Sequence, residues 1–91
     1  MKTKRLLEKL ALYLNADRRA LLAERDSLKK VLKKLKKKER RLKEKLAAET
    51  DAERIRKIER NLKIIYVQRQ KGVKLLRDLA ARPPPPEGGV T

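Results

Sequence analysis

The sequence of 91 residues contains no cysteine, histidine, tryptophan or phenylalanine, and its only aromatic residues are Tyr13 and Tyr66. Without histidine and cysteine, the chain lacks the side chains that most often act as general bases, nucleophiles and transition-metal ligands. The absence of cysteine also excludes a disulfide framework. The carboxylates are scattered along the chain, so they form no recognisable metal-binding motif. We therefore expect no catalytic residue, no metal site, no cofactor and no enzymatic activity.

Glycine, proline and long hydrophobic runs are also scarce. Gly72 is the only glycine or proline before Pro83, so long stretches of the chain contain no helix breaker. No apolar run approaches the roughly 20 residues that cross a membrane. Glu8 and Lys9 interrupt the leucine-rich N-terminal segment, which does not have the form of a signal peptide. We expect a cytoplasmic protein without integral membrane association.

Leucines recur every seven residues through the first half of the chain. Because seven residues make almost two helical turns, the repeat places these leucines on one stripe of a long helix. The repeat predicts a single helix over about 3–48, although Asn15-Ala16-Asp17 is also a possible helix start with Asn15 as its cap. The unbroken repeat favours a continuous helix over a break at Asn15. The leucines of the stripe are Leu7, Leu14, Leu21, Leu28, Leu35 and Leu42.

A second helix is predicted after a capping-box pattern, Thr50-Asp51-Ala52-Glu53. In this pattern the Thr50 hydroxyl accepts a hydrogen bond from the Glu53 amide, while the Glu53 side chain returns to Thr50. We therefore place a turn at about 48–50 and a second helix at about 51–81. Pro83 ends this helix, because the residue before a proline disfavours the α conformation. The domain covers 1–82, and 83–91 form a proline-rich, disordered tail.

Pairing the two helices about this turn places apolar side chains opposite one another. Gly72 would cost about 1 kcal/mol inside a helix, so it indicates either close packing or a local break. The fold class that the sequence predicts is an all-α, antiparallel, coiled-coil-like helical hairpin. The predicted pairs are Leu42 with Ile58, Leu35 with Ile65, Leu28 with Gly72, and Leu21 with Leu79.

Two groups of apolar residues lie outside this pairing. Ile64 and Val67 are on another side of the second helix, and Leu12 and Tyr13 lie beyond its end. A hairpin of two helices also buries little surface, so pairing two hairpins into a four-helix bundle would offset more of the conformational entropy. We expect a homodimer that contacts through these four residues. The alternative is that they are ordinary apolar residues on a surface.

The charge of the chain is strongly positive, with a formal net charge of +16. Eleven lysines and arginines and only two glutamates lie between Lys29 and Lys45. Such a run favours an anionic partner, and nucleic acid binds such surfaces through its phosphates with little sequence preference. Because stacking aromatics are few, we expect duplex DNA or structured RNA rather than single strands. The predicted phosphate contacts are Lys29, Lys30, Lys33, Lys34, Lys36, Lys37, Arg40 and Arg41.

Three other interpretations of the charge remain open at the level of the sequence. The basic run is also compatible with a helix face that only contacts water. The chain is alternatively a non-enzymatic structural adaptor that docks an acidic or helical protein partner. Residues 2–14, which are basic and rich in leucine, also have the composition of a segment that lies on an anionic membrane surface.

Overall fold

The computed structural model describes residues 3–81, and the tail expected over 83–91 lies outside them. It contains four helices: α1 (Thr3–Leu14), α2 (Arg18–Ala23), α3 (Arg25–Ala48) and α4 (Ala52–Ala81). No strand occurs within residues 3–81, so the all-α class predicted from the sequence is confirmed for this part of the chain. None of these helices is long and apolar enough to cross a membrane.

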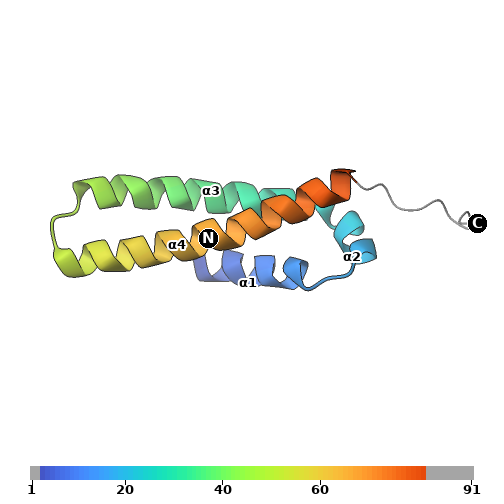
Figure 1. The fold of residues 1–91 in the computed structure, drawn as a ribbon, viewed down its shortest axis with the longest axis horizontal. Coiled ribbons are helices and arrows are strands. Elements are labelled where there is room, and N and C mark those ends of the chain that lie inside the picture. Colours follow the sequence, from blue (N-terminus) through green and yellow to red (C-terminus); the bar gives the residue numbers. More distant parts are fainter. Residues whose placement is uncertain (1–2, 82–91) are drawn as a thin grey trace, which may run out of the picture.

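The two long helices, α3 and α4, lie side by side and run in opposite directions (Figure 1). The Glu49 carboxylate organises the turn between them, because its Oε2 accepts hydrogen bonds from the amides of Thr50 (3.1 Å) and Asp51 (3.3 Å). The expected Thr50 cap is wrong: Asp51 Oδ1 accepts from the Glu53 amide at 2.9 Å. α4 begins at Ala52, and Asp51 is its N-cap.

The continuous helix expected over 3–48 is wrong, because the chain reverses between α1 and α2. α1 ends at Leu14, where the side chain of Asn15 donates a hydrogen bond to the carbonyl of Ala11 at 3.0 Å. Asp17, rather than Asn15, caps the next helix: its Oδ1 accepts from the Ala20 amide at 2.8 Å. Both helix ends are therefore satisfied locally, and α1 folds back along α3 and α4 (Figure 1).

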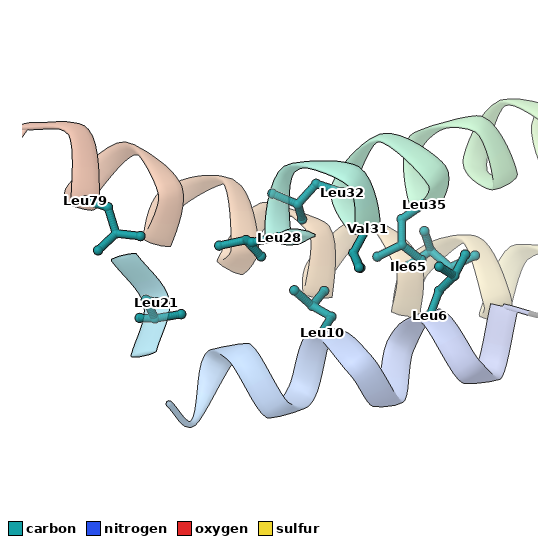
Figure 2. Close-up of a cluster of buried hydrophobic side chains, with 9 residues drawn as sticks. All are labelled: Leu6, Leu10, Leu21, Leu28, Val31, Leu32, Leu35, Ile65 and Leu79. Carbon is teal, nitrogen blue, oxygen red and sulfur yellow. The ribbon is translucent and has the colours of Figure 1, made fainter. Parts of the chain in front are cut away.

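A second interruption separates α2 from α3 at Glu24. The backbone there has φ −107° and ψ 18°, outside the helical region. Hydrogen bonds nevertheless continue on both sides, from the Glu24 amide to the Ala20 carbonyl and from the Leu28 amide to the Glu24 carbonyl, each at 3.0 Å. The expected helix therefore persists over most of 18–48, but as two helices that meet at Glu24. α2 brings Leu21 to Leu79 near the end of α4 (Figure 2).

Most of the hydrophobic core lies where α1, α3 and α4 meet, and α2 adds Leu21. Leu6 and Leu10 of α1 point toward the facing surfaces of α3 and α4 (Figure 2), and both are fully buried. Folding back thus covers apolar side chains that would be exposed on a continuous helix, which is the physical reason for the reversal. The buried apolar residues are Leu6, Leu10, Leu21, Leu28, Val31, Leu32, Leu35, Ile65 and Leu79.

Gly72 of α4 lies against side chains of both α3 and α1. A Cβ atom placed on it would lie 2.5 Å from Leu32 Cδ2 and 3.0 Å from Leu10 Cδ1. The side chains nearest to this position are therefore those of Leu32 and Leu10, and not that of Leu28, which the sequence places opposite Gly72. The sequence-based pairing considered only two helices, whereas in the structure α1 also packs against this part of α4. Close packing, and not a break in α4, explains this glycine.

Candidate nucleic-acid interface

All eight side chains predicted to contact phosphates are exposed on α3. They lie on the side of the helix opposite its buried leucines, because a helix that buries Leu28, Leu32 and Leu35 turns the intervening positions outward. From Lys29 to Arg41 this side of α3 extends for roughly 18 Å at 1.5 Å per residue. We call these eight residues the basic face of α3.

Glu39 is the only acidic residue between Lys29 and Lys43. It does not lie on the basic face, because its side chain turns toward α4 and is only 6% exposed. Arg69 of α4 donates from Nε to Glu39 Oε2 at 3.0 Å, and Lys43 Nζ lies 3.5 Å from Oε1. A buried carboxylate needs such partners, since burial of an unpaired charge is costly. The outward side of α3 between Lys29 and Arg41 therefore carries cations without a carboxylate among them.

Sequence analysis did not pair Glu39 with Arg69, although the sequence contains two signals for this ion pair. The spacing of Glu39 and Lys43 predicts an ion pair along one helix, and that pair is present. Arg69 occupies a position in the second helix where the heptad pattern expects an apolar residue. A cation at such a position requires an anion on the facing helix, and Glu39 is the residue that supplies it.

A small hollow lies at the boundary between the basic face and α1. Leu6 of α1 contributes an apolar wall, and the volume of the hollow is about 220 Å³. Its other lining residues are all cationic: Lys34, Lys37, Lys38 and Arg41. The hollow thus gathers three of the predicted contacts with Lys38, which sequence analysis did not select. Four cationic side chains around one hollow are suited to an anionic group such as a phosphate.

The four residues predicted to form a dimer interface do not line a single hollow. Ile64 lies in a groove beside α1, where Leu7 is its neighbour. Leu12 and Tyr13 line a different hollow, near the start of α3. Val67 is 41% exposed on α4, and Leu12 is 72% exposed. The dimer therefore stays a prediction. One reason for it is weaker, because the α3–α4 pair of the same chain already covers Leu6 and Leu10 of the N-terminal segment.

The described residues contain no other recognisable chemical site. Within residues 3–81, no group of three or more histidine, cysteine, aspartate or glutamate side chains is arranged to hold a metal ion. Comparison with protein-family models, curated proteins and solved structures yields no match to this chain. A functional proposal therefore depends on the charge and geometry of the bundle itself.

Proposed function

We propose that this protein binds duplex DNA or structured RNA through phosphate contacts from the basic face of α3, with little sequence preference. The observation that carries the proposal is the inward orientation of Glu39. Because Arg69 pairs with this carboxylate inside the bundle, no exposed carboxylate lies between Lys29 and Arg41. The nearest ones on α3, Asp26 and Glu44, lie beyond the two ends of the basic face. Like charges so close together repel one another, and an anionic polymer would relieve that repulsion.

The composition of the basic face supports contacts to phosphates rather than to bases. Six of its eight residues are lysines, which act as compact point charges and lack the planar fork that arginine uses to read guanine. The two tyrosines of the chain lie on α1 and α4, so the face offers no aromatic surface for stacking unpaired bases. Duplexes, whose phosphates are regularly spaced and whose bases are stacked, fit such a surface best.

The rigidity of α3 also favours binding. The core leucines and the Glu39–Arg69 pair fix one side of the helix against its neighbours. The backbone positions from which the cations project are therefore fixed before a ligand binds. Less conformational entropy of the backbone is then lost on binding than with a disordered basic segment.

Matched substitutions test whether binding depends on the basic face or only on the total charge. One variant replaces three residues of the face by glutamine: Lys33→Gln, Lys37→Gln and Arg40→Gln. Its control replaces three exposed cations of α4: Arg56→Gln, Arg60→Gln and Lys63→Gln. The two variants have the same net charge, and circular dichroism should show unchanged helicity for both.

Affinity for several unrelated duplexes is then measured by fluorescence anisotropy at one salt concentration. We expect the α3 variant to lose affinity by the same factor for every sequence, because phosphate contacts carry no sequence information. The α4 variant should lose much less. An equal loss for both variants would show that the charge acts diffusely, and the proposal for α3 would be wrong.

A further inference from the structure

α1 covers only part of the α3–α4 pair. Its 12 residues extend for roughly 18 Å, whereas the 30 residues of α4 extend for roughly 45 Å. α1 begins near the middle of the bundle, so no third helix lies beside the half that contains the turn (Figure 1). In this half the facing side chains of α3 and α4, such as Leu42 and Ile58, are only partly buried.

A groove between α3 and α4 begins beside α1 and extends into this uncovered half. It consists of two adjoining hollows of about 550 Å³ and about 540 Å³, which share Leu42 and Asn61. Leu42, Ile58 and Ile64 supply apolar surface along its length. At one end the groove reaches the flank of α1, and at the other it reaches Glu49 at the turn. We call it the distal groove.

The edges of the distal groove are positively charged. Lys4, Lys45 and Lys57 line it, against the carboxylates of Glu8 and Glu49. Glu49 is already engaged, because its Oε2 accepts hydrogen bonds from two turn amides and its Oε1 lies 4.0 Å from Arg54. Cations that could pair with a ligand therefore outnumber the remaining carboxylate.

We propose that the distal groove binds an amphipathic helix of another protein whose polar flanks are acidic. α1 shows how a helix packs on this surface, since it contacts both α3 and α4 through leucines four residues apart, Leu6 and Leu10. A partner helix would lie beyond α1 and present apolar residues at the same spacing to Leu42, Ile58 and Ile64. Glutamates or aspartates on its flanks would pair with the lysines at the edges.

Charge makes an acidic partner a better occupant than a second copy of this chain. The protein carries a net charge of +16, so two copies repel one another. Its own apolar helices are basic: α1, for example, carries Lys4, Arg5 and Lys9 against Glu8. A second copy would therefore bring lysines and arginines to edges that are already cationic, at a cost that an acidic helix avoids.

A synthetic peptide of about 12 residues tests this proposal. The probe carries leucines at helical spacing i, i+3, i+4 and i+7 and glutamates on both flanks. One control peptide has the same composition in scrambled order, and another carries lysines in place of the glutamates. Binding is measured by fluorescence anisotropy in about 0.15 M salt, where charges separated by more than about 8 Å are largely screened. We expect the scrambled and the lysine peptides to bind at least about tenfold more weakly than the probe.

Protein variants locate the binding site on the distal groove. Ile64 lines the groove and is 45% exposed, while Val67, one turn along α4, is 41% exposed. Ile64→Glu should weaken binding of the acidic peptide about tenfold or more, whereas the matched change Val67→Glu should weaken it far less. Reversing the charge at the edges with Lys45→Glu and Lys57→Glu should favour the lysine peptide over the acidic one. Circular dichroism confirms that each variant keeps its helicity.

Three results would overturn the proposal. The first is equal affinity for the amphipathic and the scrambled acidic peptide, which indicates general attraction to a basic protein. The second is an equal effect of the Ile64→Glu and Val67→Glu substitutions. The third is a dimer by light scattering that Ile64→Glu converts to a monomer, because a second copy then occupies the groove. Duplex binding through the basic face is measured separately, so either proposal can fail without the other.

Discussion

Replacing Leu10 by alanine tests the packing of α1, the part of the fold that periodicity predicts incorrectly. Leu10 is fully buried, whereas Leu12 on the same helix is 72% exposed. Leu12→Ala is therefore a matched control, with the same chemical change in the same helix. If α1 packs on α3 and α4, only the change at Leu10 removes buried apolar surface.

The size of the expected effect follows from this burial. Truncating a fully buried leucine to alanine costs about 2–5 kcal/mol, which combines the lost transfer free energy with the cavity that remains. The surroundings of Leu10 include Gly72 on α4, and both neighbouring helices are held by other core contacts, so the cavity should collapse only partly. We expect a loss of about 3 kcal/mol for Leu10→Ala. For Leu12→Ala we expect a change within about 0.5 kcal/mol.

Urea unfolding, followed by circular dichroism, measures both values. A loss of about 3 kcal/mol is a large fraction of the roughly 5–15 kcal/mol that stabilise a typical domain, so the midpoint should shift clearly. If α1 detaches before the rest unfolds, the loss of stability caused by Leu10→Ala is limited to the free energy with which α1 docks. Leu10→Ala and its control Leu12→Ala should still differ in that case. Equal effects at Leu10 and Leu12 would refute the packing of α1 against the α3–α4 pair.

Three further contacts are tested by the same unfolding measurement. In an exposed helix, Gly→Ala raises the free energy of unfolding by about 1 kcal/mol. Gly72→Ala should not give this gain, because the new methyl group would meet buried Leu32 and overpacking costs about 1–3 kcal/mol. A clear gain in stability would mean that the site is open. Arg69→Leu should cost about 3 kcal/mol of stability, because it leaves Glu39 buried without its main partner. Adding Glu39→Leu should recover most of that loss. A double variant as unstable as Arg69→Leu alone would contradict the importance of this ion pair. Asp17→Ala should cost about 1 kcal/mol through loss of the cap on α2, and no change would show that the cap is unimportant.

The helical content and the two longest helices could be predicted from local patterns. Leucine spacing and the absence of glycine and proline indicate helix wherever they occur. The capping-box pattern at 50–53 located the turn, since α3 ends at Ala48 and α4 begins at Ala52, close to the expected turn at 48–50. The capping-box pattern assigns the cap to Thr50, but Asp51 is an equally good capping residue, and it accepts the hydrogen bond from the Glu53 amide instead.

The reversal after Leu14 could not be predicted from periodicity. Leu7 and Leu14 keep the seven-residue spacing with Leu21 across Asn15–Asp17, so the pattern is the same for a straight helix and for one that folds back. The decision depends on burial of Leu6 and Leu10 against helices that come later in the chain. Such long-range packing overrides local preference and has no signature within a short window.

The exposure of the cations on α3 could be predicted from the sequence, but the burial of Glu39 could not. The sequence places exposed cations along α3 because they lie between the leucines of one stripe. It also places Glu39 among them, as an ordinary partner of Lys43. Only the contact with Arg69, 30 residues away, shows that this carboxylate belongs to the interior. The distal groove is likewise a consequence of how far α1 reaches, which the sequence pattern does not specify.

The salt dependence of duplex binding tests the central proposal most directly. If the basic face neutralises roughly five to eight phosphates of B-DNA, the logarithm of the binding constant should fall with the logarithm of salt concentration with a slope of about −4 to −7. Replacing Lys33, Lys34, Lys36 and Lys37 by glutamine should flatten this slope by about one unit for each lost contact, while helicity stays unchanged. Binding that neither salt nor these four substitutions alter would contradict recognition of phosphates by α3.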